Sequence, residues 1–216
     1  GHDITTTPSR KIAQTLSILR QENHFVTRLT VRQLVGFGRY PYTRGRLTLE
    51  DERHVSDAID FLNLGPFENR YLDQLSGGQR QRAFVAMVLA QDTEVVLLDE
   101  PLGALDLKLR RQMQVELKRI QTEVGLTFIH VTHDQEEAMT MADTVAVMNH
   151  GRIEQMGHPE AMYDLPSTAF VATFLGQSNL GEGKVVDRDG EMKVVEVAGT
   201  RVKIPDSRFS AEGDDV

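Results

Sequence analysis

Two adjacent carboxylates directly follow a short apolar run, in a position that suits phosphate chemistry. Asp99 and Glu100 come after Val95–Leu98, a run whose length and β-branched content predict a buried strand of a parallel sheet. Open α/β sheets bind their ligands at the carboxyl edge, where these acids would lie. In a phosphate-handling protein the first acid can hold Mg²⁺, and the second can polarise an attacking water as a general base. Two acids that cap a helix after the strand are the alternative, and the pair alone fits both interpretations.

A serine and two glycines precede the next chemically suggestive helix. Leu75-Ser76-Gly77-Gly78-Gln79 comes directly before an apolar helical segment that contains Phe84, Met87 and Val88. The two glycines expose backbone N–H groups at the positive end of the helix dipole, which can bind an anion. Ser76 can either cap the helix or bond that anion. Taken alone, the motif favours a plain helix cap with a flexible glycine pair over an anion site.

Two histidines lie in or beside a predicted strand at 127–132. His130 and His133 would project to opposite faces of such a strand, which argues against a two-histidine metal site. His133 stands at the strand end, next to the carboxylate edge, where it can contact a phosphate. His130 is expected to pack within the core or the sheet.

Strands alternate with helices along most of the chain, which predicts an α/β protein with a parallel sheet. Thr48-Leu49-Glu50-Asp51 resembles a capping box, and Asp106 is placed to cap a long helix. From Gly181 onward the pattern changes to short alternating strands, which predicts a separate all-β segment. The expected strands are 15–19, 95–98 and 127–132, with a hairpin of 144–148 and 152–156; the expected helices start at 30 and 48, follow 76 and 106, and span 135–141.

Composition narrows the class of protein. The 216 residues are 40% hydrophobic and 26% charged, which excludes collagen-like and wholly disordered chains, and the lack of cysteine excludes disulfides and thiolate chemistry. The longest apolar run, Ala83–Ala90, is far shorter than the roughly 18 residues of a membrane span, so we expect a soluble protein of cytoplasmic type. Residues 1–90 hold 12 basic and 9 acidic side chains, whereas residues 91–216 hold 12 and 23. This acidic second part argues against nucleic acid as a partner.

The order of these motifs resembles the ATP-binding subunit of ABC transporters. Along the chain come a glutamine after a short strand, Leu-Ser-Gly-Gly-Gln, a strand that ends in Asp-Glu, Ala-Leu-Asp at 104–106 and Thr-His-Asp at 132–134. The resemblance covers residues 1 to about 175. It implies a P-loop NTPase (RecA-like) ATPase domain at 1–175, with a helical subdomain at about 22–75. Residues 176–216 resemble the start of a β-rich, OB-like regulatory domain.

The resemblance also implies a role for each matching residue. Gln21 would contact Mg²⁺ and the attacking water, Asp99 would hold Mg²⁺, and Glu100 would be the catalytic base. His133 matches the switch histidine, and Asp106 matches an aspartate at the dimer interface. The signature residues would bind the γ-phosphate of ATP held by the opposite subunit; they are Ser76, Gly77, Gly78 and Gln79.

The implied cofactors are ATP and Mg²⁺, and the implied assembly is a homodimer or heterodimer of ATPase subunits. Its partners would be the transmembrane permease subunits of an importer, with an extracytoplasmic binding protein acting indirectly and no nucleic acid. The aromatic stretch of Phe37, Tyr40 and Tyr42 lies where the family receives its membrane partner. Such a subunit is cytoplasmic and peripheral on the inner face of the cell membrane.

Two family features are missing, which suggests an N-terminally incomplete ATPase domain. The Gly-x-x-x-x-Gly-Lys-Ser/Thr phosphate loop is absent, because Gly183-Lys184 is the sole Gly-Lys and Val185 follows it. The adenine-stacking aromatic is absent too. We therefore expect a core without its first strand, loop and helix, an exposed apolar face on the sheet, and very weak ATP binding and no turnover by this chain alone.

The two parts of the chain resemble importer branches that transport different substrates. Residues 1–92, with Arg39-Tyr40-Pro41-Tyr42, are similar to the iron–siderophore branch. Residues 93–216, with Pro101–Asp106 and the β segment, are similar to the polyamine or sugar branch. The alternatives to an importer ATPase are a truncated, non-hydrolysing interaction module and a non-transport ABC ATPase that acts on nucleic acid or ribosomes. The acidic second part disfavours the last of these.

Overall fold

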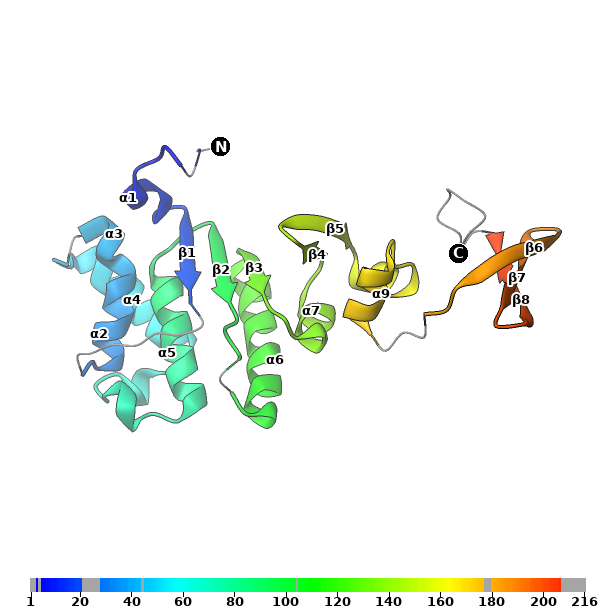
Figure 1. Cartoon of the computed structure of the whole chain (residues 1–216). Coiled ribbons are helices and arrows are strands. Elements are labelled where there is room, and N and C mark those ends of the chain that lie inside the picture. The colour runs from blue at the N-terminus through cyan, green and yellow to red at the C-terminus, as the bar shows by residue number, and fades with distance from the viewer. Residues whose placement is uncertain are drawn as a thin grey trace. The chain divides into compact units, whose positions relative to one another are not determined.

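The computed structural model describes residues 3, 5–20, 28–43, 45–103, 105–176 and 180–206. The chain forms two compact units, Gly1–His133 and Asp134–Val216, and each is considered by itself. The mixed α/β class expected from the sequence is confirmed (Figure 1). The predicted domain boundary near residue 175 stays a prediction.

A parallel three-stranded sheet lies at the centre of the first unit. Its strands are β1 (Leu16–Leu19), β2 (Val95–Asp99) and β3 (Thr127–Val131), in the order β1-β2-β3. The register places Leu19 beside Leu98, and Leu98 beside His130. The three predicted strands and their parallel arrangement are confirmed, with ends that differ by one residue.

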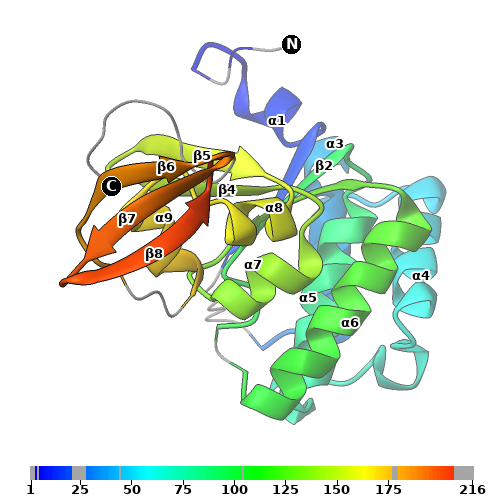
Figure 2. The same ribbon diagram turned by 90° about the vertical axis from the view of Figure 1, so that its right-hand side faces the viewer.

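Helices connect these strands, and their starts follow the capping residues of the sequence. Thr48 and Asp51 form the predicted capping box of α4, and Asp106 caps α6 through its bond from the Leu109 N–H. Helix α4 packs against α5 (Figure 2), and both pack against α2. The bounds are α1 Ser9–Ile12, α2 Val31–Gly36, η1 Phe37–Arg39, α3 Tyr40–Thr43, α4 Leu49–Phe61, η2 Gly65–Phe67, η3 Leu72–Gln74, α5 Gly77–Ala90 and α6 Leu107–Val124.

The two faces of this sheet have different surroundings. Leu19, Val96 and Leu98 are buried on one face, where their side chains join the core. The alternate residues Ile18 and Ile129, which flank Leu97 in the register, are about half exposed. Alternation along a strand puts these side chains on the opposite face. The expectation of an exposed apolar sheet face is therefore confirmed.

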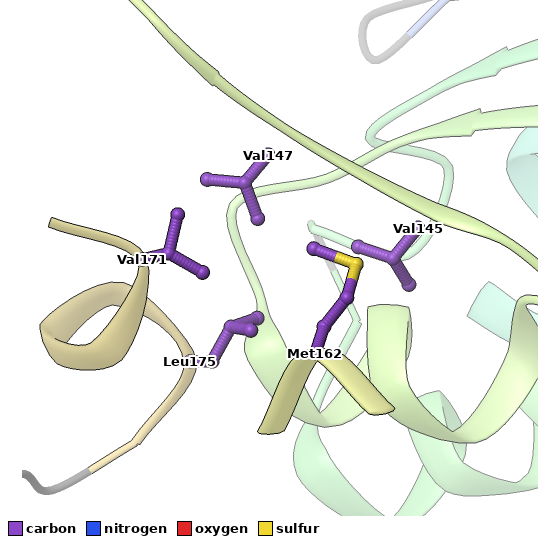
Figure 3. Close-up of a cluster of buried hydrophobic side chains, with 5 residues drawn as sticks. All are labelled: Val145, Val147, Met162, Val171 and Leu175. Carbon is purple, nitrogen blue, oxygen red and sulfur yellow. The ribbon is translucent and has the colours of Figure 1, made fainter. Parts of the chain in front are cut away.

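The first part of the second unit folds around a small apolar core (Figure 3). Val145 and Val147 come from β4, Met162 from α8, and Val171 and Leu175 from α9, and their side chains point toward one another. The predicted helix 135–141 and the predicted hairpin are confirmed. The elements are α7 Gln135–Met141, β4 Val145–Asn149, β5 Arg152–Gly157, α8 Pro159–Asp164 and α9 Ala169–Leu175.

The second unit also contains an antiparallel sheet of β6 (Gly183–Asp189), β7 (Met192–Val197) and β8 (Thr200–Pro205). Gly190 and Gly199 have positive φ angles in the turns that join these strands, a conformation that glycine adopts without strain. The expected β segment after Gly181 is confirmed, and its OB-like class stays a prediction. Among the described residues, the helices are too short or too polar to cross a bilayer.

Candidate functional site

Most of the sequence-predicted site residues that the structure describes lie at one end of the parallel sheet; they are Asp99, Glu100, His133, Asp106 and Ser76–Gln79. Strands β2 and β3 finish at this end, and helices α5 and α6 begin there (Figure 1). The reason is topological, because each helix must run back along the sheet before the next parallel strand can start. Helix N-termini and strand carboxyl ends consequently meet on the side where open α/β sheets bind ligands.

Glu100 and His133 form the closest functional pair at this end. His133 Nδ1–H donates to Glu100 Oε1 over 2.9 Å, across 33 residues of sequence. The His133 side chain is 76% exposed, whereas Glu100 is 25% exposed. A half-sheltered carboxylate held by an exposed imidazole can orient a water molecule or accept its proton. The sequence located both residues at the carboxyl edge, and the structure adds their contact.

The backbone of Glu100 is held in an uncommon conformation. Its φ angle is +43°, in the left-handed region that residues other than glycine rarely adopt. The Glu100 N–H donates to the Val131 carbonyl over 2.9 Å, and the Glu100 carbonyl accepts from the Gly103 N–H over 3.2 Å. These bonds anchor the turn after β2 to the end of β3. Strained backbone that its surroundings hold in place is a feature of functional sites.

Asp99 is the last residue of β2, and its side chain is exposed. It pairs in the sheet with Val131, on the face that also carries Ile129. A carboxylate at this place can hold Mg²⁺, which proteins bind through one or two carboxylates together with substrate phosphates. Within the described ranges, no cluster of three or more metal-ligating side chains forms an all-protein metal site. The residues present fit a Mg²⁺ ion that arrives with a phosphate ligand.

Ser76 and Gln79 cap α5 reciprocally. Ser76 Oγ accepts from the Gln79 N–H over 3.3 Å, and Gln79 Oε1 accepts from the Ser76 N–H over 3.0 Å. This capping box fixes the first turn of a helix that is otherwise largely buried. The plain helix cap considered from the sequence is therefore present, and it leaves the motif at a helix N-terminus where an anion can bind.

Gly77 and Gly78 lie against the first turn of α6. A Cβ atom at Gly78 would stand 2.8 Å from Leu109 Cδ1, and one at Gly77 would stand 3.3 Å from Leu109 Cδ2. Asp106 Oδ1 accepts from the Leu109 N–H over 2.9 Å in that same turn. The structure thus brings the glycine pair and Asp106 together through one leucine, Leu109.

The remaining predicted residues have separate positions. Gln21 lies outside the described residues, and so does Ala104. His130 is partly buried beside Leu98 in the sheet, and burial lowers the pKa of its imidazole, which favours the neutral form. This placement agrees with the packing role expected for His130.

An aromatic segment in η1 and α3 lies apart from the sheet edge. Phe37 and Tyr40 are among its exposed large side chains, whereas the Tyr42 ring stacks under the Arg39 guanidinium at 4.1 Å. Arg39 is itself buried and paired with Asp51. The sequence indicated the aromatic residues but not the ion pair, because it marked Asp51 only as part of the Thr48 capping box.

Comparison with known proteins identifies relatives of this arrangement. Residues 1–103 match the family model described as ABC transporter. The petrobactin import ATP-binding protein FatE of Bacillus anthracis is 56% identical over 162 residues, which cover 75% of this chain and 65% of FatE. The spermidine/putrescine import ATP-binding protein PotA of Acetivibrio thermocellus is 45% identical over 210 residues, or 97% of this chain and 57% of PotA. The chain thus spans less than two thirds of the length of either relative.

Solved structures give the same fold. A chain of an ABC transporter in an inward-facing conformation matches 90% of this chain and 74% of its own length, with a TM-score of 0.66 and 22% identity. The cbiO1 protein of Clostridium perfringens, part of the ABC transporter complex cbiONQ, matches 71% of this chain and 61% of its own length, with a TM-score of 0.63 and 28% identity. The α/β fold expected from the sequence is confirmed by both.

Proposed function

Because residues 1–103 belong to the ABC transporter family and the relatives FatE and PotA are import ATP-binding proteins, we propose that this chain belongs to the ATP-hydrolysing subunit that powers an ABC importer. The observation that carries the proposal is the 2.9 Å bond between His133 and Glu100 at the carboxyl edge of the sheet. It joins an acid and a histidine from two different strand ends, at the position where a general base and a phosphate-sensing group are needed.

Glu100 is the proposed base. Its carboxylate would orient a water molecule and accept the proton that this water loses on attacking the γ-phosphate. His133 keeps the carboxylate in position through its Nδ1–H, and its exposed ring can reach a phosphate oxygen. Asp99 would hold Mg²⁺, which neutralises phosphate charge when bound. Gln21 is proposed, on the family resemblance, to contact the same metal and water.

The signature residues are proposed to complete the site of a second subunit. Ser76, Gly77, Gly78 and Gln79 form a capped helix N-terminus, and its N–H groups would bind the γ-phosphate of ATP held by that subunit. Asp106 would lie at the dimer interface, in the turn that packs on the glycine pair. Either two copies of the protein or two different ATPase subunits can form such a dimer.

The proposed partners are the transmembrane permease subunits of the importer. The exposed rings of Phe37 and Tyr40 offer an apolar surface for a helix of such a partner. The subunit would be cytoplasmic and peripheral on the inner face of the membrane, with an extracytoplasmic binding protein as an indirect partner and no nucleic acid. The names of FatE and PotA support an iron–siderophore or a polyamine as the cargo.

Phosphate release from Mg-ATP by the purified full-length gene product tests the enzymatic part. Glu100→Gln should lower kcat by about 10²–10⁴-fold, because the amide cannot accept the proton. Asp73→Asn, which changes an exposed acid outside the site, is the matched control and should leave kcat unchanged. If Glu100→Gln turns over ATP at the wild-type rate, Glu100 is not the base. A wild-type protein without turnover, alone or with its permease, would favour the interaction module instead.

Uptake measurements identify the cargo. A strain that lacks the gene should lose uptake of either labelled spermidine or a labelled iron–siderophore complex and regain it on complementation. Complementation with the Glu100→Gln gene should fail. Uptake of both compounds at unchanged rates in the deletion strain would refute an importer of either class.

A further inference from the structure

Leu109 connects two elements that have a role in the proposed function: the Ser76–Gln79 turn, which would contact nucleotide, and Asp106, which would lie at the dimer interface. Its two methyl groups lie against the α-carbons of Gly77 and Gly78, so closely that a Cβ at Gly78 would come within 2.8 Å of Cδ1. Its backbone N–H donates to Asp106 Oδ1 over 2.9 Å. One residue therefore contacts the signature glycines through its side chain and the cap of α6 through its backbone.

A second bond holds the same two elements together nearby. Gln81 Nε2, one turn into α5, donates to the Pro101 carbonyl over 2.7 Å. Pro101 directly follows Glu100, so this bond fixes α5 to the connection that leads from β2 to α6. This bond and the Leu109 methyl groups therefore both hold the start of α5 against the segment that leads into α6.

We propose that Leu109 is a positioning residue, which sets the place of the Ser76–Gln79 turn relative to Asp106. The inference rests on the proposed function, which gives nucleotide contact to the Ser76–Gln79 turn and a place at the dimer interface to Asp106. The capping box sets the conformation of the turn itself, whereas the side chain packed on the glycine α-carbons sets how closely the turn approaches α6. Leu109 is half-buried, so its contribution to overall stability is smaller than that of a core leucine.

A matched pair of substitutions on the same helix separates positioning from stability. Leu117 also lies on α6 but is fully buried in the core. Leu117→Ala removes the same atoms as Leu109→Ala and should lower the melting temperature more, because it leaves a larger internal cavity. Leu109→Met keeps the volume of the side chain and should preserve its contact with the glycines.

Amide hydrogen exchange, read residue by residue by NMR, gives the first test. The Gln79 and Arg80 amides bond to the side chain and carbonyl of Ser76. Leu109→Ala should speed the exchange of these two amides by about tenfold, because lost packing makes local opening of the turn easier. Leu109→Met should leave their exchange near the wild-type rate. Leu117→Ala should affect these two amides no more than the rest of α5.

ATP turnover by the full-length gene product gives the second test. Leu109→Ala should lower kcat/KM by about tenfold, Leu109→Met should restore it, and Leu117→Ala should leave it unchanged in the folded protein. Unchanged exchange and unchanged kcat/KM in Leu109→Ala, or equal effects of Leu117→Ala, would overturn the inference. Exchange requires no turnover, so it decides whether Leu109 positions the turn even where wild-type turnover is absent and the ATPase proposal fails.

Discussion

Replacing Asp51 by asparagine should strongly destabilise the first unit, because it removes the partner of a buried guanidinium. Arg39 Nε donates to Asp51 Oδ1 over 2.8 Å, and the two side chains are only 7% and 6% exposed. Arg39 Nη1 also donates to the Ala90 carbonyl at the end of α5, over 3.0 Å. Asparagine keeps the shape and an acceptor oxygen but not the charge, so Arg39 would remain buried without a counter-ion.

The size of the effect follows from burial. Removing one partner of a buried pair costs about 3–5 kcal/mol, chiefly because the remaining charge stays desolvated. The asparagine side chain in Asp51→Asn would retain part of the capping interaction with Thr48, so we expect a loss of about 3 kcal/mol. The matched control is Asp73→Asn, which breaks the Arg28–Asp73 pair at 3.0 Å with side chains 58% and 59% exposed. That exposed pair should contribute no more than about 1 kcal/mol.

The same carboxylate should add a pH dependence to the stability of the wild-type protein. Burial raises the pKa of Asp51, but the bonds from Thr48 and from the Arg39 guanidinium outweigh it and lower this pKa from 3.8 to about 2. A lowered folded-state pKa means that the unfolded chain binds the proton first, so the stabilisation is complete above about pH 4. This stabilisation is lost as the pH falls from about 4 through about 2. Asp51→Asn should lack this pH-dependent part of the stability.

Native-state hydrogen exchange is the suitable assay, since the chain forms two compact units and a global unfolding signal would combine them. Protection should fall in α4 and α5 of Asp51→Asn, whereas α8 and α9 in the second unit should keep theirs. The reasoning is refuted if Asp51→Asn lowers the free energy of unfolding no more than Asp73→Asn does. It is also refuted if the wild-type protein and Asp51→Asn lose stability equally between pH 4 and pH 2.

Two further substitutions test the packing of each unit. Gly38→Ala should lower the free energy of unfolding by about 3 kcal/mol or more, because its Cβ would lie 2.1 Å from the Met87 carbonyl oxygen. Its control, Gly36→Ala, has ordinary contacts and should be neutral or stabilising. Equal melting temperatures of the two variants would contradict the close packing of η1 on α5. Met162→Ala should cost about 2–5 kcal/mol and reduce protection only in the second unit, because this side chain is 1% exposed in its core. Met156→Ala, 66% exposed, is its control and should change stability by less than about 0.5 kcal/mol; a loss of protection in the first unit of Met162→Ala would contradict the independence of the two cores.

Local elements were predictable because their signals are local. The Thr48 capping box and the Asp106 cap depend on residues three positions apart, and both form as expected. The strand before Asp99 was recognisable from its apolar run, and its carboxyl end from the two acids. The left-handed backbone at Glu100 could not be predicted, because it depends on hydrogen bonds to Val131 and Gly103 that the hydrophobic pattern of the sequence does not reveal.

Contacts between distant residues were beyond sequence reasoning. In the sequence, Arg39 belonged to a polar–aromatic stretch, and Asp51 was a helix-capping acid. They form a buried ion pair only because η1 packs against α4 and α5. The lack of a side chain at Gly38 permits the close approach of η1 to α5, and no residue near it in the sequence indicates this contact. Each depends on how helices pack, which the spacing of residues along one helix does not specify.

By itself, the sequence determined the α/β class, the parallel strands, the helix caps and the candidate residues at the carboxyl edge, because hydrophobic period and capping act within a few residues. Tertiary structure decided which of those candidates meet. It placed His133 on Glu100 across 33 residues of chain, and it packed Leu109, which was not a candidate, on Gly77 and Gly78. Such contacts depend on the register of neighbouring strands and on the close approach of two helices, and both are set by the packing of the whole unit.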